Sequence, residues 1–340
     1  MGMKNFGFLS FGHYTHGDDQ RPRALGGGFP GLSAGESLRQ AVELAVAAEE
    51  LGAGGAYFRV HHFARQSSAP MPLLAAVAAR TTTLEVGTGV IDMRYENPLY
   101  LAEEAAALDL LSGGRVALGV SRGAVDPVER GWEAFGHTGS TDPRGADLGY
   151  AHFERFLAAV RGEPMARTTG GGRVRVEPFS PGLDTRVWWG SGSRDTAEWA
   201  ARQGVNLMSS TLLTEADGRP LGELQAEQIA RYRAVWAESG HTREPRVSVS
   251  RSVFPLVSDL DRALWAGDRH STDQVGTIDG YTSTFGRSYA AEPDRLVEML
   301  RADPAVAAAD TLMLTVPSQL GVEYNTHVLE AFAEHVAPHL

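Results

Sequence analysis

The chain has 340 residues, of which 43% are hydrophobic and 21% charged, enough to bury a large core in one domain or two. Its formal net charge of −11 disfavours unaided binding to nucleic acid or to anionic membranes. It contains no cysteine, which excludes disulfides, thiolate catalysis and cysteine-ligated metal centres.

The first half of the chain alternates short apolar runs with stretches of helical periodicity. Strands are predicted at residues 6–11, 56–60, 84–91 and 116–120, and helices at 33–51, 70–80 and 98–112. A Gly-rich polar loop, residues 12–31, precedes the first helix, whose Ser33 and Glu36 fit a capping box. Asn97 is the expected N-cap of the third helix. The buried stripe of that helix is expected to comprise Leu101, Ala105, Leu108 and Leu111.

The same alternation continues through the second half. Strands are predicted at residues 186–189, 205–208, 247–254 and 311–315, and helices at 150–160, 196–203, 221–238, 294–301 and 322–336. Eight strands, nearly all followed by helices, indicate a parallel α/β sheet with right-handed crossovers. We therefore predict a (β/α)8 TIM barrel with insertions after strands. A doubly wound open sheet is the alternative, although no GxGxxG sequence follows the first strand.

Two connections are longer than a minimal barrel needs. Residues 161–185 are turn-rich, with a possible small hairpin at 174–176. Residues 258–292 are polar and follow the carboxyl end of a strand, where loops of this length commonly act as lids. We predict a single domain over residues 1–340 with residues 258–292 as a candidate lid.

Two histidines, His61 and His62, end the second strand. Adjacent strand residues point to opposite faces, so only one ring can enter the barrel. This argues against a metal site on the pair, and no nearby set of acidic or His ligands compensates. One inward His at the carboxyl face of a barrel suits a general base or hydrogen-bond donor, with ordinary packing as the alternative.

Two further signals favour an anion site at the same end of the barrel. Arg122 follows the fourth strand between small residues, and Ser193 and Thr196 open the helix after the fifth. A guanidinium, hydroxyl donors and the free N–H groups of a helix start together suit a phosphate. A surface ion pair and a simple N-cap are the alternatives.

The order of these motifs resembles the bacterial luciferase-like family of flavin-dependent monooxygenases. The similar segments are AAEELG at 47–52, HHF at 61–63, VGTGV at 86–90, LDLLSGGR at 108–115, LGVSRG at 118–123 and GSGSRDTAEWAA at 190–201. The resemblance spans nearly the whole chain, and the block from residue 84 to residue 123 is its most specific part.

The resemblance implies an FMN cofactor at the carboxyl face of the barrel. Arg122, Ser193 and Thr196 match residues that hold the FMN phosphate, and Arg144 matches a further phosphate-contacting arginine across a one-residue gap. Ser121 matches a position beside the flavin ring. Thr88 and Gly89 belong to a segment that packs against the flavin and often contains a non-proline cis peptide. His61 matches the family's catalytic histidine.

As implied by the resemblance, reduced FMN comes from a partner flavin reductase, and O2 oxygenates a small organic substrate. Val60 departs from the family's usual Glu before the paired histidines, and the polar residues 93–96 do not suit a long aliphatic aldehyde. An F420-dependent hydride-transfer enzyme is the alternative, but such members carry Asp where this chain has His61. A non-catalytic flavin-binding protein is a further alternative. A barrel hydrolase or aldolase is disfavoured, because it would need a metal set or a strand-end lysine.

The resemblance also implies a homodimer. The first residues lack the apolar core of a signal peptide, and no apolar run reaches membrane-spanning length. We therefore expect a cytoplasmic protein without nucleic-acid, membrane or metal ligands.

Overall fold

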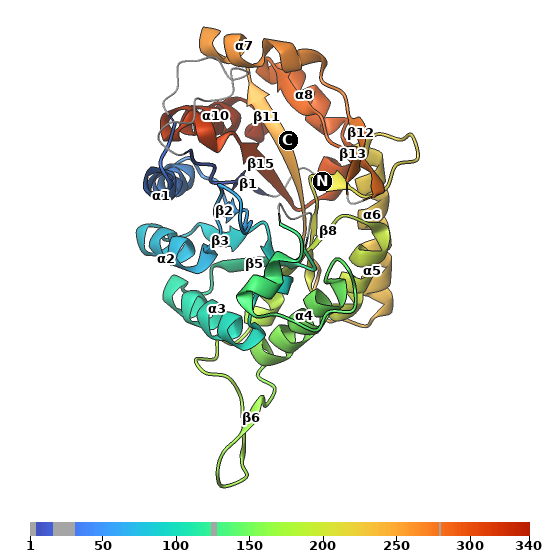
Figure 1. The fold of residues 1–340 in the computed structure, drawn as a ribbon. Helices are drawn as coiled ribbons and strands as arrows, with labels where there is room; N and C mark the ends of the chain where they lie inside the picture. Colours follow the sequence, from blue (N-terminus) through green and yellow to red (C-terminus); the bar gives the residue numbers. More distant parts are fainter. Residues whose placement is uncertain (1–4, 16–30, 124–127, 279) are drawn as a thin grey trace.

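Eight parallel strands form a closed barrel in the computed structural model, which describes residues 5–15, 31–123, 128–278 and 280–340 (Figure 1). The barrel strands are β1 (Asn5–Ser10), β2 (Gly55–Phe58), β3 (Glu85–Thr88), β5 (Val116–Ser121), β8 (Val187–Ser191), β9 (Asn206–Ser209), β11 (Val247–Pro255) and β15 (Thr311–Val316). The ring closes because β11 pairs with both β9 and β15, and β15 pairs with β1. The barrel prediction is confirmed, and the open-sheet alternative is wrong.

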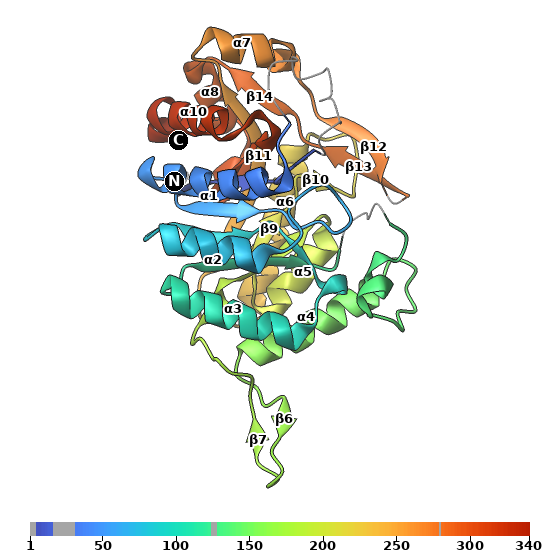
Figure 2. The same ribbon diagram turned by 60° about the vertical axis from the view of Figure 1, so that its left-hand side comes forward.

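The helices cover the outside of this ring. They are α1 (Ala34–Glu50), α2 (Pro70–Arg80), α3 (Pro98–Ser112), α4 (Ala146–Val160), α5 (Arg194–Gln203), α6 (Leu221–Glu238), α8 (Pro293–Arg301) and α10 (Val322–His335), with the short α7 (Asp259–Trp265) and α9 (Pro304–Ala308). Helices α1, α2 and α3 lie side by side on one flank (Figure 2). The predicted capping box is present, because Ser33 accepts from the Glu36 backbone and Glu36 accepts from the Ser33 backbone. No helix in the described ranges is long and apolar enough to cross a membrane.

Strand alternation divides the apolar side chains between the barrel interior and the layer under the helices. Phe58 and Val60 point outward and pack beneath the helices. Tyr57 points inward, where its hydroxyl donates to the Glu85 carboxylate at 3.0 Å. Arg246 donates to both oxygens of the same carboxylate, at 2.6 and 2.9 Å. This hydrogen-bonded group packs the barrel interior at the end where β3 and β11 begin.

Two details differ from the predicted elements. The third strand is not continuous over residues 84–91, because it stops at Thr88 and a short β4 (Ile91–Asp92) continues beside β5. The Gly89–Val90 peptide between them is cis, at the place that the family resemblance implied. Leu111 is 79% exposed rather than part of the buried stripe of α3. The core face of that helix runs from Ala105 to Leu108, Asp109 and Ser112, so Leu111 falls on the opposite side.

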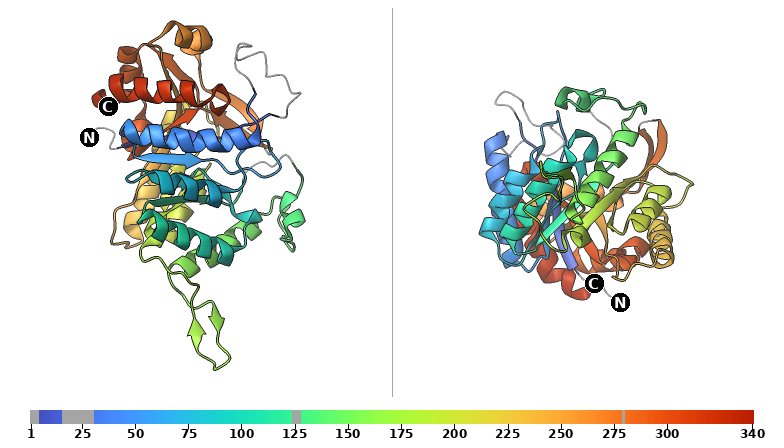
Figure 3. Two further views of the ribbon diagram at one scale, coloured as in Figure 1. Left: turned by 90° about the vertical axis from the view of Figure 1, so that its left-hand side faces the viewer. Right: turned by 90° about the horizontal axis from the view of Figure 1, so that it is seen from below.

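The two long connections contain secondary structure. In the first, β6 (Ala166–Arg167) and β7 (Arg173–Val174) form a small hairpin that projects from the barrel (Figure 3). It lies slightly before the predicted position. In the second, β12 (Gln274–Ile278) and β13 (Tyr281–Phe285) form an antiparallel sheet with β10 (Leu212–Leu213), and β14 (Ser288–Ala291) pairs with β11. Residues 16–30 of the predicted Gly-rich loop lie outside the described residues.

Candidate functional site

A cavity of about 310 Å³ opens at the carboxyl ends of the barrel strands. Its wall includes residues at or just after β2, β4, β5, β8 and β9, together with residues from β12 and β13. Its deeper surface is apolar and includes Leu9, Val90, Met208 and Met313. Side chains from distant parts of the sequence therefore meet in one place, as parallel strand ends in a barrel require.

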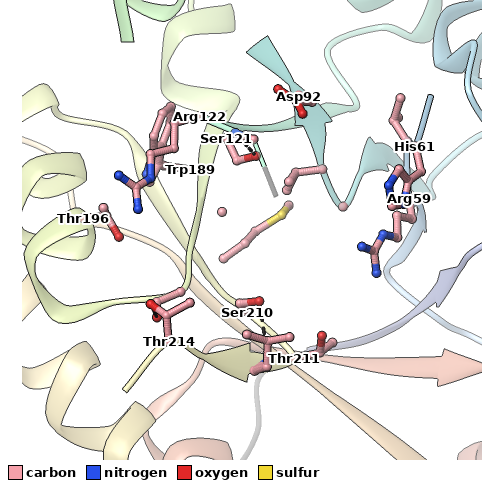
Figure 4. A pocket seen from close by; sticks show the side chains of 18 of the residues that line it. Arg59, His61, Asp92, Ser121, Arg122, Trp189, Thr196, Ser210, Thr211 and Thr214 are labelled. Atoms are coloured by element: carbon pink, nitrogen blue, oxygen red, sulfur yellow. Dashed lines mark hydrogen bonds between the residues drawn. The ribbon is translucent and has the colours of Figure 1, made fainter. Parts of the chain in front are cut away.

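His61 enters this cavity from the end of β2 (Figure 4). Tyr57, Arg59 and His61 occupy alternate positions, so all three face the barrel interior. The neighbouring His62 is buried, with its ring stacked on Tyr95 at a centroid distance of 4.2 Å. Both histidines therefore belong to the cavity lining, but the His62 ring is engaged in an aromatic cluster with Tyr95 and Phe135. Within the described part of the chain, no group of three acidic or His side chains could hold a metal ion.

The three residues predicted to hold a phosphate lie in the wall of the same cavity. Arg122 follows β5, Ser193 is the N-cap of α5, and Thr196 lies in the first turn of α5. The Ser193 Oγ accepts from the Thr196 backbone N–H at 3.4 Å and lies 3.0 Å from the Thr196 Oγ1. Gln228 on α6 fixes this turn by donating to the Ser193 carbonyl at 2.9 Å.

Arg122 forms no ion pair with any residue that the structure describes. It lies beside Tyr150, whose pKa is raised by burial despite the opposing positive charge of Arg122. Gly149 permits this approach of α4, because a Cβ there would lie 2.8 Å from the Arg122 carbonyl oxygen. A half-buried guanidinium without a carboxylate partner is suited to an external anion.

Arg144 lies at the outer wall of the cavity. Its guanidinium carbon is 4.4 Å from the ring centroid of Tyr281 on β13. Its backbone carbonyl accepts from the Arg94 guanidinium at 2.9 Å. The predicted lid segment therefore contributes Tyr281 to the same wall as Arg144.

The remaining predicted cofactor positions divide into two groups. Ser121 and Gly89 line the cavity, and the Ser121 Oγ accepts from the Gly123 backbone N–H at 3.2 Å. Thr88 is fully buried, and its hydroxyl donates to the Gly119 carbonyl at 2.6 Å. The structure therefore does not bring the Thr88 side chain to the cavity with the others.

Several wall residues were not predicted from the sequence. Asp92 and Arg94 form a mutual ion pair in the wall, with a distance of 3.0 Å between Arg94 Nε and Asp92 Oδ1. Arg59 and Phe11 lie near His61, with the Arg59 guanidinium carbon 4.8 Å from the Phe11 ring centroid. The place of Arg59 in the wall could have been predicted, because it lies two positions before His61 and alternate strand residues share a face.

The charge of the cavity wall is opposite to that of the whole chain. Its described ionisable side chains other than His and Tyr are Arg59, Arg94, Arg122, Arg144, Asp92 and Asp142. Four arginines against two aspartates give a positive wall in a chain of net charge −11. A site of this kind favours anionic ligands.

A family model described as "Luciferase-like monooxygenase" matches residues 13–314. The chain belongs to this family. Its fold and the order of its strand-end motifs agree with that membership, so the resemblance seen in the sequence is confirmed.

Curated relatives of this luciferase-like chain match over part of their length. Proteins y4vJ and y4wF of Sinorhizobium fredii are 36% and 29% identical over 65% and 58% of this chain. The oxygenase component of a flavin-dependent trigonelline monooxygenase from Acinetobacter baylyi is 23% identical over 67% of this chain. The matches cover 62%, 55% and 62% of these relatives, less than two thirds of each.

Solved structures resemble the luciferase-like barrel over nearly its whole length. The monooxygenase RslO1 from Streptomyces bottropensis has a TM-score of 0.72 and 20% identity, covering 98% of this chain and 99% of its own. The oxygenating constituent of 3,6-diketocamphane monooxygenase from Pseudomonas putida, in complex with FMN, has a TM-score of 0.68 and 16% identity, covering 99% and 98%.

An F420-dependent secondary alcohol dehydrogenase is also a structural neighbour, with a TM-score of 0.64 and 16% identity, covering 99% of both chains. FMN-bound and F420-dependent proteins thus share this fold. At these identities the likeness establishes the fold alone, and the choice of cofactor depends on the residues of the site.

Proposed function

We propose that this chain is an FMN-dependent monooxygenase that takes reduced FMN from a separate flavin reductase and oxygenates a small organic substrate. One observation carries the proposal: Arg122, without an ion-pair partner in the described chain, lies with Ser193 and Thr196 in the cavity that also contains His61. Membership of the luciferase-like family supports the flavin-dependent chemistry.

The donor set around Arg122 fits the phosphate of FMN. The first turn of α5 offers free backbone N–H groups and a partial positive charge, to which Ser193 and Thr196 add hydroxyls. A guanidinium can donate two parallel hydrogen bonds to phosphate oxygens. Arg144 would supply a further positive charge from the outer wall.

The inner wall fits a flat aromatic ring system. Gly89 and Gly190 present no side chain, and a Cβ on Gly190 would lie 3.0 Å from both γ-carbons of Val90. Val90 and Met208 supply apolar contact, and Ser121 supplies one hydroxyl. When bound, reduced FMN would supply the chemistry that activates O2, which no amino-acid side chain can perform.

The chain itself would orient the reactants and control protons and water. A ring nitrogen of His61 would hold or transfer a proton at the substrate oxygen atom, since His61 is the cavity's inward-facing strand-end histidine. Val60 takes the place of the family's usual Glu, but its side chain packs beneath the helices. We infer that His61 works here without an adjacent buried carboxylate from position 60.

Residues 258–292 would act as the lid that excludes water from the cavity. Ile278 and Tyr281 of this segment line the cavity, and Tyr281 lies against Arg144. A ligand phosphate that engages Arg144 would therefore also affect the contact between Arg144 and the lid. The proposed unit is a homodimer, as the family resemblance implies.

The test is anaerobic titration of the purified full-length protein with reduced FMN and, separately, with reduced F420. We expect tight binding of FMN and weak binding of F420. Arg122→Met should weaken FMN binding about 10- to 100-fold but leave riboflavin binding nearly unchanged, because riboflavin lacks the phosphate.

Two results would contradict this proposal in different ways. Tight binding of F420 with weak binding of FMN would keep the cavity but replace oxygenation by hydride transfer. Equal losses of FMN and riboflavin affinity in Arg122→Met would remove Arg122 from the phosphate site. Circular dichroism of the variant controls for misfolding.

A further inference from the structure

Arg59 is a second cation in the cavity wall that the proposed FMN site does not use. It follows β2 directly, and its backbone N–H donates to the Ser10 carbonyl at 2.9 Å, which holds it in strand geometry. Strand alternation places it on the same face as Tyr57 and His61. Figure 4 shows Arg59 and His61 together on one side of the cavity, across from Arg122 and Thr196.

Arg59 has no carboxylate partner in the described chain. Arg94, another arginine of the cavity wall, is neutralised by Asp92. By contrast, no ion pair or side-chain hydrogen bond joins Arg59 to any residue that the structure describes. Burial lowers the pKa of Arg59 below its ordinary value, which reflects the cost of desolvating an unpaired charge. Arg59 therefore carries a free-energy cost of desolvation that a bound anion would reduce.

The groups around Arg59 do not replace that anion. The Arg59 guanidinium lies over the Phe11 ring. The Phe11 ring in turn stacks on His13, with 5.6 Å between the ring centroids. Burial and the positive charge of Arg59 both lower the pKa of His13. Ser318 and Gln66 lie within hydrogen-bond distance of the His13 ring nitrogens. Among the residues that the structure describes, the surroundings of Arg59 are thus aromatic and without a carboxylate.

We propose that the organic substrate carries a carboxylate that binds Arg59, so that Arg59 selects anionic substrates and holds them next to His61. The planar guanidinium matches a carboxylate with two parallel hydrogen bonds, and the Phe11 ring and the apolar wall residues Leu9 and Met313 would receive the body of an aromatic or aliphatic acid. This inference rests on the proposed function, because it assigns the cofactor phosphate to Arg122 and leaves Arg59 for another anion.

The test measures binding of paired probes to the full-length protein by calorimetry, with and without FMN. The probes are benzoate, phenylacetate, 1-naphthoate and decanoate, each compared with its own carboxamide. We expect at least one acid to bind wild type more tightly than its amide does. Arg59→Met should weaken binding of that acid about 10- to 100-fold and leave the amide unchanged. Arg59→Lys, which keeps the charge but loses the planar fork, should recover part of the affinity.

Arg122→Met is the matched control, since it removes an arginine that has no ion-pair partner in the described chain from the other side of the same cavity. It should weaken FMN and leave acid binding unchanged, whereas Arg59→Met should do the reverse. Arg59→Met should also unfold at a temperature no lower than wild type, because it removes a desolvated charge without breaking an ion pair. This readout separates loss of binding from loss of structure.

Several outcomes would overturn the inference. It is wrong if every acid binds no better than its amide, or if Arg59→Met leaves the acid preference intact. It is also wrong if Arg59→Met weakens reduced FMN but not the acids, since Arg59 would then serve the negative charge of the reduced cofactor. If FMN fails to bind while acids still require Arg59, the proposed function fails, and only the selection of acids by Arg59 stands.

Discussion

At the residue scale, the site depends on which charged side chains find partners within the fold. Arg94 is neutralised by Asp92, whereas Arg59 and Arg122 have no such partner in the described chain and face the cavity from opposite sides. The meeting of His61, Arg122, Ser193 and Thr196 in one cavity could be predicted, because strand ends converge in a barrel. The lack of an ion-pair partner for Arg59 could not, because it depends on which carboxylates lie within reach of its side chain after folding.

Glu96, two residues beyond the buried Arg94, carries an unfavourable charge. Burial, followed by the nearby Glu104 and Asp92 carboxylates, raises its pKa from 4.5 to about 7. A raised carboxyl pKa means that the folded state prefers the proton, so stability falls as the pH rises from about 4.5 through 7.

We predict that Glu96→Gln stabilises the protein at pH 8 by on the order of 2 kcal/mol, because it removes this charge. The gain over wild type should shrink to nothing as the pH falls toward 4.5. Thermal unfolding at a series of pH values measures it, with Glu103→Gln as a control for removing one exposed negative charge from α3. A gain that is constant with pH would show that Glu96 acts by some other means.

At the element scale, the sequence predicted helices more reliably than the boundaries of the site-forming strands. The caps of α1 and α3 depend on local side chains, Ser33 and Asn97, which the sequence displays. The break between β3 and β4 and the strands of residues 258–292 depend on pairing with distant segments, such as Leu212 with Phe285. Polar strands of this kind lack an apolar alternation that could have revealed them.

The Glu49 carboxylate links the end of α1 to residues 82–84, which lie just before β3. At the end of α1, its carboxylate accepts from the backbone N–H groups of Thr82, Thr83 and Leu84, at 2.6 to 2.9 Å for Oε1. Burial opposes ionisation, but these hydrogen bonds outweigh it and lower the pKa of Glu49 from 4.5 to about 2. A lowered pKa gives stability that is present above pH 4.5 and is lost as the pH falls toward 2.

We predict that Glu49→Gln lowers the free energy of unfolding by about 1 kcal/mol at pH 7, since solvent near the surface weakens these charged hydrogen bonds. Denaturant unfolding at pH 7 and at lower pH measures the difference, which should shrink below pH 4.5. Glu50→Gln, at the adjacent exposed position, is the matched control. Equal effects of the two substitutions would contradict a specific role for Glu49.

At the scale of the whole molecule, the exposed face of α3 is the clearest candidate for contact between copies. Tyr100, Leu110 and Leu111 are 68%, 52% and 79% exposed on this one helix. The prediction that Leu111 would be buried in the monomer was wrong, but the apolar residue at that position is consistent with burial in a dimer.

We predict that the wild type is a dimer joined through α3 and that Leu111→Glu makes it monomeric, because a further charge among the exposed Tyr100, Leu110 and Leu111 would oppose their burial. Light scattering coupled to size-exclusion chromatography measures the change in mass. Leu38→Glu, at an exposed leucine of α1, should leave the mass unchanged. A dimer that persists in Leu111→Glu, or a monomeric wild type, would rule out α3 as the interface.

The closed ring of strands has a consequence for ligand selection. In a sheet with free edges, an edge strand is hydrogen-bonded on one side only. In this barrel every strand is bonded on both sides; β15, for example, pairs with β1 and with β11. No barrel strand can shift without breaking two sets of hydrogen bonds, which fixes the backbone from which Arg59 and Arg122 project after β2 and β5. The closed barrel thus gives both ligand-facing arginines a rigid backbone base, so that binding of one ligand is not expected to displace the strand that presents the other arginine.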